Sequence, residues 1–547
     1  MSSGRPSSLG LGLVCAVATL ALGCPDTHED RDAAGADAAL ASIDAEGADA
    51  AGAADASPDA LVAPRVCTGP VLHVATSGDD AQDGSEASPW RTLAHAARSA
   101  PPGSTIHLAA GTFEETETAE LPERVCLEGE GAATVVRSTL TDEFVPMLRL
   151  SSATEGSAGA QSISAITFDG RMSTRWGIQV GARSDVEIHD CTFRDLFDSA
   201  VYWGGRADGD EGAPTTYATG NSFHHNDVTN SAFCDALYCR GAFVFGGQDG
   251  MHIHHNTIST LGRAPGAAGW PIKGQVNDGF NRNIEIDENT LVATNDAPFD
   301  FAIELFHVED VDIHHNDITG SVDTNFQTRI RVHHNRIRHA SWNPAINFSG
   351  GNAGVVLEFT TTEAEIFENH IDTVSLCFMF TPRDGHIEDV HLHHNLCDGV
   401  HVDGTRMQNE QPFTARDVRI DNNTFLAPAG ERGTWGIGLS TGGGAADFST
   451  RNNIVVGFIG GLSVSAGPTL AGLVIQNNTF FDCGDGAPSY GGTTPTGLVL
   501  EGTLTSDPLL TGEDRHPGDG SPAIDSGVDI GLGMMGSAPD RGWIETD

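Results

Sequence analysis

Short segments that alternate apolar and polar residues recur along most of the chain. In most copies an apolar residue is followed by two polar residues and then Asn, as in Ile313-His314-His315-Asn316. The spacing between these asparagines varies, and it is shortest from Asn316 to Asn335 and longest from Asn335 to Asn369. The repeated asparagines are Asn226, Asn256, Asn289, Asn316, Asn335, Asn369, Asn395, Asn423, Asn453 and Asn478.

A strand with this alternation buries one face, and no single copy can bury that face alone. Stacked copies would form a continuous apolar interior, with parallel strands about 4.8 Å apart. Each Asn could then bond the Asn of the next coil and form a ladder. Parallel strands with crossovers favour a right-handed winding. The pattern therefore predicts an all-β fold, a single-stranded right-handed parallel β-helix over residues 65–542.

The two ends of this region carry further motifs. Residues 74–80 (Val-Ala-Thr-Ser-Gly-Asp-Asp) and 88–93 (Ser-Pro-Trp-Arg-Thr-Leu) open it, and residues 520–527 (Gly-Ser-Pro-Ala-Ile-Asp-Ser-Gly) close it. On these motifs the chain resembles right-handed parallel β-helix proteins of the pectate-lyase-like class, from residue 71 to about 542. The resemblance implies the fold and a preference for acidic polysaccharide. It does not imply one activity, because the class includes lyases, hydrolases, epimerases and proteins of no known activity.

The opening motif predicts a short helix that caps the N-terminal end of the β-helix. Ser88 suits the N-cap and Pro89 the first turn. One face of this helix would be apolar and would cover the open core, as terminal repeats require. That face comprises Trp90, Leu93, Ala94 and Ala97.

The first 64 residues have a different composition. Residues 1–23 are typical of a secretory signal, with Arg5 before an apolar run that ends at Leu22. The following Cys24 resembles the acylated cysteine of bacterial lipoproteins, although an ordinary signal with cleavage nearby is the alternative. Residues 24–64, rich in Ala and Asp, predict a disordered tether. We therefore expect an exported protein, anchored by lipid alone to a bacterial membrane, at the outer membrane or cell surface.

The charge of the chain limits the classes of partner, and its cysteines indicate candidate disulfides. The formal net charge of −46 excludes nucleic acid as a plausible partner. We expect a monomer.

Ten cysteines are present, and an oxidising compartment would favour pairs among the eight that remain after Cys15 and Cys24. No CxxC spacing occurs, which argues against a thiolate zinc site. The candidate disulfide pairs are Cys234 with Cys239, Cys377 with Cys397, and Cys67 with Cys126.

Candidate chemistry lies on strands upstream of the asparagines. Glu304 precedes Asn316 by nearly the same interval as Glu358 precedes Asn369, so we expect both carboxylates to point outward from similar coil positions. Lys273, the single lysine of the chain, belongs to an earlier coil. Because these side chains point outward, we expect their substitution to leave stability nearly unchanged. The predicted polar strip comprises Lys273, Glu304, Glu358, Arg383, His401 and Asp403.

Three functions remain open for this strip. In a polysaccharide lyase, Lys273 would be the base and Arg383 the charge partner, with a Ca²⁺ ion on Glu304 or Glu358. Polysaccharide lyases such as chondroitinase B have a Lys-Ser segment before an Asn-Asn-Thr-Phe turn, which Ile272-Lys273-Gly274 before Glu288-Asn289-Thr290-Leu291 resembles in part. His401 and Asp403 would bind substrate.

Two alternatives use the same residues differently. Glu304 and Glu358 could form the carboxylate pair of a hydrolase. A non-catalytic surface module that binds glycan or protein would instead hold Lys273 as an ion pair with Glu304.

Several histidines precede the repeated asparagines and should form an outward column. We expect these rings to stack and to bond at the turn, because coils about 4.8 Å apart place imidazoles two coils apart too far from one another for a single zinc ion. These histidines are His224, His254, His314, His333 and His393.

Overall fold

The computed structural model divides into two units, residues 1–62 and 63–547, and every described residue belongs to the second. The described residues are 67–142, 145–207, 213–232, 241–260, 269–275, 280–293, 301–340, 342, 352–382, 385–408, 413–440, 444–465, 472–484, 489–490 and 497–546. The predicted signal and tether, Cys24, Cys234, Cys239 and Arg383 lie outside them.

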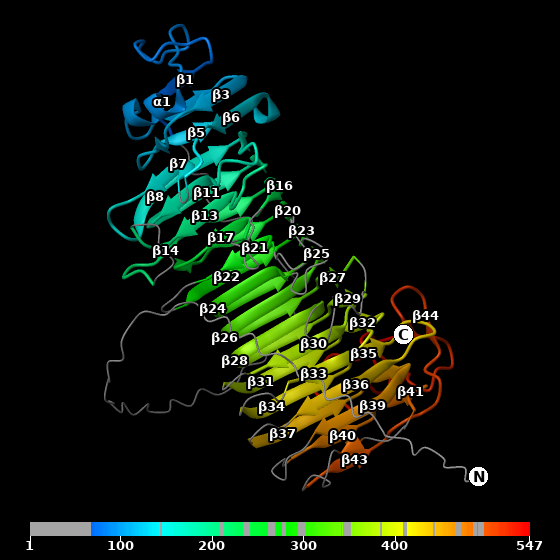
Figure 1. Cartoon of the computed structure of the whole chain (residues 1–547). Helices are drawn as coiled ribbons and strands as arrows, with labels where there is room; N and C mark the ends of the chain where they lie inside the picture. Colours follow the sequence, from blue (N-terminus) through cyan, green and yellow to red (C-terminus); the bar gives the residue numbers. More distant parts are fainter. Residues whose placement is uncertain are drawn as a thin grey trace, which may run out of the picture. The chain divides into compact units, whose positions relative to one another are not determined.

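Two parallel sheets make up the described β-structure (Figure 1). One has 29 strands, from β1 (Val71–Val74) to β43 (Val499–Glu501). The other has 14 strands, from β3 (Gly111–Glu115) to β41 (Thr479–Phe481). Successive coils add one strand after another in parallel register, so the predicted all-β parallel β-helix is confirmed. A small antiparallel pair, β44 (Leu510–Thr511) with β45 (His516–Pro517), lies outside both sheets.

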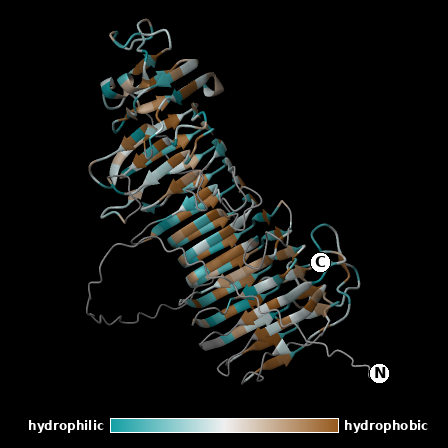
Figure 2. Cartoon of the chain, in the orientation of Figure 1, coloured by the Kyte–Doolittle hydropathy of each residue, from teal (hydrophilic) through white to brown (hydrophobic). Residues whose placement is uncertain are grey.

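Alternating side chains enter a single interior. One apolar cluster extends from Val74 to Phe480, and Figure 2 shows apolar and polar positions alternating along the stacked strands. This alternation is the physical basis of the fold, because inward residues of each coil pack on those of the next.

The repeated asparagines form a hydrogen-bonded column inside the turn. From Asn226 to Asn478, each Nδ2 donates to the Oδ1 of the next Asn at 2.9 to 3.1 Å. The same Oδ1 accepts the backbone N–H of the Asn before it, for example Asn316 to Asn335 at 3.0 Å. The residue before each Asn has left-handed backbone, a conformation in which Asn, Asp and His are enriched. These residues are His225, His255, Glu288, His315, His334, Glu368, His394, Asn422, Asn452 and Asn477.

Three long strands divide the large sheet into two outward faces. They are β24 (Phe301–His314), β26 (Ser321–His333) and β28 (Ala353–Phe367), and each bends at left-handed residues near its middle. The first half of β24 pairs with β21 (Ile272–Gly274), whereas its second half pairs with β22 (Asn281–Asp287). We call the outward side chains before the bends the first face and those after the bends the second face.

The neighbouring strands extend both faces. The first face continues through β30 (Leu376–Thr381) and β33 (Asp403–Met407). The second face includes β19 (His252–His254) on one side and β31 (His386–His393) and β34 (Thr414–Asp421) on the other.

The N-terminal helix is present but begins later than the motif predicted. Helix α1 spans Leu93–Ser99, and its N-cap is Thr92, whose hydroxyl accepts the His95 N–H at 3.2 Å. The predicted N-cap at Ser88 was wrong, because Trp90 pairs with Val74 as an extended bridge before the helix starts. Leu93, Ala94 and Ala97 are buried as predicted, as is Ala96.

Two of the predicted disulfides form. Cys67 pairs with Cys126 on β5 (Cys126–Glu128), and Cys377 pairs with Cys397 on β32 (Leu396–Asp398). Cys191 and Cys483 are unpaired within the described part of the chain. None of the helices described there has the length and apolar character that a bilayer crossing requires.

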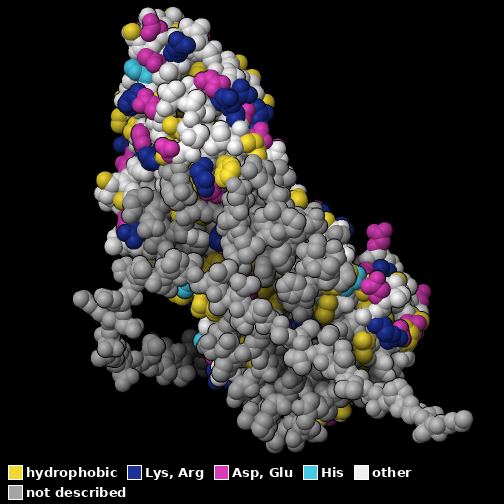
Figure 3. Space-filling view, viewed as in Figure 1, with side chains coloured by type: hydrophobic (Ala, Val, Ile, Leu, Met, Phe, Trp, Pro, Cys, Tyr) yellow, Lys and Arg dark blue, Asp and Glu magenta, His cyan; other side chains and the backbone are white. Residues whose placement is uncertain are grey.

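The acidic surface is partly neutralised by ion pairs between coils. Figure 3 shows basic side chains beside acidic ones over the N-terminal coils. Examples in this region are Arg149 with Glu120 at 2.7 Å and Arg137 with Asp169 at 3.0 Å.

Candidate functional site

Lys273 and Glu304 meet on the first face. They are directly opposite in the parallel register of β21 and β24, and Lys273 Nζ lies 2.7 Å from Glu304 Oε2. Both side chains are largely buried, with exposed fractions of 14% and 8%. The ion pair that the sequence left as an alternative is therefore present, and it is not on open surface.

Aromatic rings enclose the lysine. The Lys273 ammonium lies 4.0 Å from the ring centroid of Trp270 and 5.5 Å from that of Phe306. An ammonium over an aromatic face is attracted by the ring quadrupole. To act as a base, Lys273 would have to lose its proton and leave both these rings and the Glu304 carboxylate with which it forms an ion pair.

The pKa of the Glu304 carboxyl group is raised, which favours a role in proton transfer. Burial raises the pKa of its carboxyl above the usual range, and the adjacent Lys273 ammonium opposes that rise without cancelling it. A carboxyl group with a raised pKa, close to a cation, is a common arrangement for general acid–base chemistry.

Asp323 on β26 is a site residue that the sequence reasoning missed. It is opposite Glu304 in the register of β24 and β26, is buried, and accepts a 2.8 Å hydrogen bond from Asn325 Nδ2. A signal for it was available, because Asp323 precedes Asn335 by the same interval as Glu304 precedes Asn316.

Glu358 does not share the position of Glu304, which corrects the prediction from residue counting. It is opposite Asn325 and Thr381, whereas Val356 occupies the position next to Asp323. Between Glu358 and the Asn turn, β28 contains one more residue than β26, at the left-handed Phe359. Glu304 and Glu358 therefore stand two coils apart and in different columns, which does not favour them as a hydrolase pair. The Ca²⁺ ion expected on Glu304 or Glu358 stays a prediction.

Apolar residues interrupt the predicted strip. Val356 and Met379 follow Asp323 in the same column and belong to a buried apolar cluster with Ala353 and Leu376. The column becomes polar again only at Arg406. The charged row Lys273–Glu304–Asp323 is thus separate from the residues further along.

Asp403 belongs to that later group. Its Oδ2 lies 2.6 Å from Arg406 Nε and its Oδ1 accepts the Trp435 N–H at 2.9 Å. Burial raises the pKa of Asp403, and the Arg406 guanidinium opposes the rise. These bonds tie Asp403 to its own strand and the next one, which indicates a structural role rather than the predicted contact with substrate.

His401 is the other predicted substrate-binding residue. Its Nδ1 lies 3.0 Å from Glu431 Oε2, and its ring stacks on Trp342 with centroids 4.8 Å apart. Burial lowers the pKa of His401, although Glu431 opposes that effect. A half-buried tryptophan stacked on a neutral imidazole offers a flat apolar surface of the kind that sugar rings contact.

Comparisons with known proteins match parts of this chain and leave its activity open. Residues 76–135 match a family described as "Protein of unknown function (DUF1565)". A 144-residue segment is 28% identical to the uncharacterized protein YwoF of Bacillus subtilis (strain 168), covering 24% of this chain and 30% of that protein.

Three solved structures are among those similar to this chain. The A-module of the mannuronan C-5 epimerase AlgE6 from Azotobacter vinelandii is 14% identical, with 76% of this chain and 93% of that one covered, and a TM-score of 0.36. The surface protein and adhesin PfbA of Streptococcus pneumoniae is 11% identical, with 60% and 90% covered, and a TM-score of 0.42. The tailspike gp49 of Pseudomonas phage LKA1 is 13% identical, with 76% and 74% covered, and a TM-score of 0.41.

Proposed function

We propose that this β-helix binds a polysaccharide over its first face and acts on it by acid–base chemistry at Glu304 and Asp323. The observation that carries the proposal is the buried row of Lys273, Glu304 and Asp323 on an outward face. Outward side chains are not needed to fill the core, and burying charge costs free energy. Such rows concentrate at functional sites.

The chemistry follows from two carboxylates on adjacent coils. Glu304, with its raised pKa, would donate a proton to the leaving oxygen of a glycosidic bond. Asp323 would act as the partner carboxylate, either on water or on the sugar. Lys273 would hold Glu304 in place and keep its charge balanced between proton transfers.

A lyase reaction is the second candidate. Lys273 lies beside a buried carboxylate and between two aromatic rings, which is a setting in which a substrate uronate could displace Glu304 from the ammonium. Asp323 would then remove the proton next to the uronate carboxyl group, while the Lys273 ammonium balances the charge that develops there. The C–O bond of the glycosidic link would break in the same elimination, and its oxygen would leave with the proton of Glu304.

The products distinguish the two reactions. The full chain would be incubated with a panel of neutral and uronic polysaccharides, while new reducing ends and the ultraviolet absorbance of unsaturated uronate are recorded. Reducing ends without absorbance indicate hydrolysis, and both together indicate a lyase. Asp323→Asn and Glu304→Gln should each lower the rate by a factor of about 10²–10⁴. Glu117→Gln, an exposed carboxylate paired with Arg98, is the matched control. Binding without any product would leave only a glycan-binding module.

Export and lipid anchoring through Cys24 complete the proposal. Two disulfides in the described part support an oxidising compartment. Cys24→Ala should move the protein from the membrane fraction to the soluble fraction, and an unchanged distribution would reject the anchor.

A further inference from the structure

The second face carries imidazoles and carboxylates in adjacent columns. His252 and His254 lie at alternate positions of β19 and point to the same side, with ring centroids 3.9 Å apart. On the next coil, Glu285 and Asp287 of β22 stand directly opposite these two histidines. Parallel stacking thus brings four potential metal ligands onto one patch.

Three of these side chains converge on one point. His252 Nε2 lies 2.6 Å from Asp287 Oδ1 and 3.8 Å from Glu285 Oε2, and one ligand atom from each residue falls within 4.8 Å of the other two. The second oxygen of Glu285 lies 3.3 Å from Nε2 of His314 on β24. The group therefore spans three consecutive coils.

We propose that His252, Glu285 and Asp287 bind a divalent transition-metal ion such as Zn²⁺, with His314 or water as a further ligand. Zinc takes imidazole nitrogen and carboxylate oxygen at about 2.0–2.2 Å, so donor atoms around it stand a little over 3 Å apart. The observed separations bracket that value. Ca²⁺ prefers an all-oxygen shell of six to eight ligands, which this group does not offer.

The charges around the group favour a cation. Glu285 and Asp287 are both paired with imidazoles. The two carboxylates together would offset the charge of one divalent ion.

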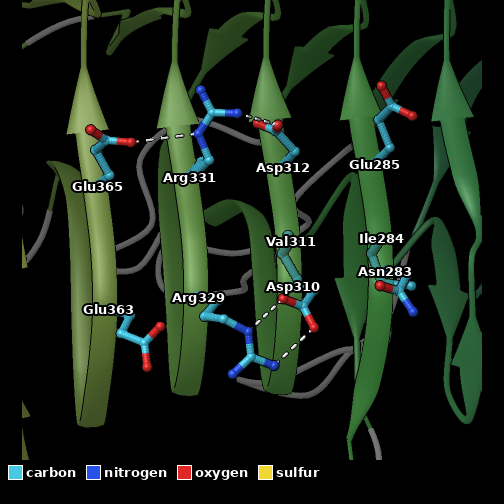
Figure 4. Close-up of a pocket in the computed structure, with 10 residues that line it drawn as sticks. All are labelled: Asn283, Ile284, Glu285, Asp310, Val311, Asp312, Arg329, Arg331, Glu363 and Glu365. Carbon is cyan, nitrogen blue, oxygen red and sulfur yellow. Dashed lines mark hydrogen bonds and ion pairs between the residues drawn. The ribbon is translucent and has the colours of Figure 1, made fainter. Parts of the chain in front are cut away.

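A second group of potential metal ligands on the second face has an arginine beside it, so its surroundings do not favour a cation. Glu365, His391 and His393 also bring three ligand atoms within 4.8 Å of one another. Here Arg331 reaches Glu365 at 3.6 Å and Asp312 at 3.2 Å, as the dashed lines in Figure 4 show, and its guanidinium would repel a metal ion. Glu285 stands beyond Asp312 in the same view, and neither arginine drawn there bonds to it. An open hollow of about 550 Å³ on this face is lined by, among others, Glu285, Asp312, Arg331 and Glu365, so solvent and ions reach these side chains.

This site differs from the histidine column that the sequence predicted. The column does stack, for example His224 on His254 at 4.7 Å and His314 on His333 at 5.1 Å, and stacked rings alone do not make a metal site. Glu285 and Asp287 of β22 supply the carboxylate ligands that the stacked imidazoles lack. Substitution of a carboxylate therefore distinguishes a metal site that needs Glu285 and Asp287 from weak metal binding by the imidazoles alone.

The test is metal binding by the full chain, and it does not depend on the proposed function. After removal of metal with a chelator, Zn²⁺ is titrated by calorimetry and Co²⁺ by its visible absorption, which reports coordination geometry. We expect one tight site. Asp287→Asn, Glu285→Gln and His252→Gln should each weaken it by about tenfold or more. His224→Gln, which removes a stacked imidazole bonded to the Glu187 carboxylate at 2.9 Å, should leave the affinity unchanged.

Thermal unfolding gives a second measurement. Zn²⁺ should raise the melting temperature of the wild type and of His224→Gln but not that of Asp287→Asn, while circular dichroism confirms that each variant is folded. Wild-type affinity in both carboxylate variants would overturn the proposal, because binding would then rest on imidazoles alone. An equal loss in His224→Gln, or displacement of Zn²⁺ by Ca²⁺ at equal concentration, would overturn it as well.

Discussion

The two outward faces of the large sheet are built by the same strands, yet their charges have different surroundings. On the first face, Lys273 and Glu304 form a pair with exposed fractions of 14% and 8%. On the second face, Arg331 and Asp312 form a pair with exposed fractions of 49% and 33%. Register brings both pairs together, but burial makes the first pair costly to break, and it is the largest cause of the raised pKa of Glu304. Burial therefore distinguishes the candidate catalytic face from the ion-binding face.

The largest expected effect comes from breaking the buried pair. Lys273→Met leaves Glu304 buried without its cation, and the free energy of unfolding should fall by about 3–5 kcal/mol in guanidinium titration. The sequence alone predicted that this outward lysine could be replaced with nearly unchanged stability. Its contacts with Trp270, Phe306 and Glu304 now predict a cost instead. Arg331→Met on the second face is the control and should cost less than about 1 kcal/mol. Equal losses would remove the distinction between the faces.

The next largest effect is expected from the asparagine column. It gives the stability cost of breaking a buried hydrogen bond, against which the costs on the two outward faces can be compared. Asn316 donates to Asn335 at 3.0 Å and accepts from Asn289 at 3.0 Å, and it is buried. Asn316→Leu should lower the free energy of unfolding by about 1–3 kcal/mol. The adjacent His315→Asn keeps the left-handed backbone that Asn422 has in a later coil, and it should change stability by less than about 0.5 kcal/mol. A wild-type melting curve for Asn316→Leu would contradict the role given to the column.

A smaller effect on stability is expected from pH, through His394 in the turn beside the second face. Burial, with the nearby His393 and His391, lowers the pKa of His394 from 6.5 to about 4. Below pH 6.5 the unfolded chain therefore binds a proton that the folded chain does not, so this residue makes stability fall as pH decreases from 6.5 to about 4. His394→Asn should remove up to about 1.4 kcal/mol of that loss per pH unit.

Denaturant titrations at pH 7 and pH 5 would measure this difference. Asn occupies the equivalent left-handed position at Asn422 and Asn452, so the backbone tolerates the change. Parallel pH curves for the wild type and the variant would show that His394 is protonated in the folded protein as readily as in the unfolded chain.

The sequence was sufficient to predict the repeat but not the environment of its outward side chains. The recurring Asn positions predicted the stacking of coils, and the separation of Cys377 and Cys397 by 20 residues, about one coil, indicated one of the two disulfides. Counting from Asn335 could also have found Asp323. The extra residue at Phe359 defeats the same counting for Glu358, because a single inserted residue in a strand moves everything before it out of register.

Burial could not be predicted because alternation says only which way a side chain points. Lys273 and Glu304 point outward as expected and are nevertheless covered. The carboxylate–imidazole group was missed for a related reason. It combines His252 with Glu285 and Asp287 of the next coil. Counting back from Asn256 and Asn289 gives this register, but alternation does not say which outward side chains converge on one point.

The smallest expected effect separates the two faces by salt. Arg331 bridges Asp312 at 3.2 Å and Glu365 at 3.6 Å on an open surface, so its interactions are screened by ions. Arg331→Gln should lower the free energy of unfolding by less than about 1 kcal/mol at low salt, and the difference should vanish near 1 M salt, where the Debye length is about 3 Å. Urea titration at both salt concentrations measures it. The cost of Lys273→Met should persist at high salt, because ions do not enter between Lys273 and Glu304, whose contact is 2.7 Å and largely buried. If salt reduced both costs equally, the first face would be as open to solvent as the second, and the case for a buried acid at Glu304 would fail with it.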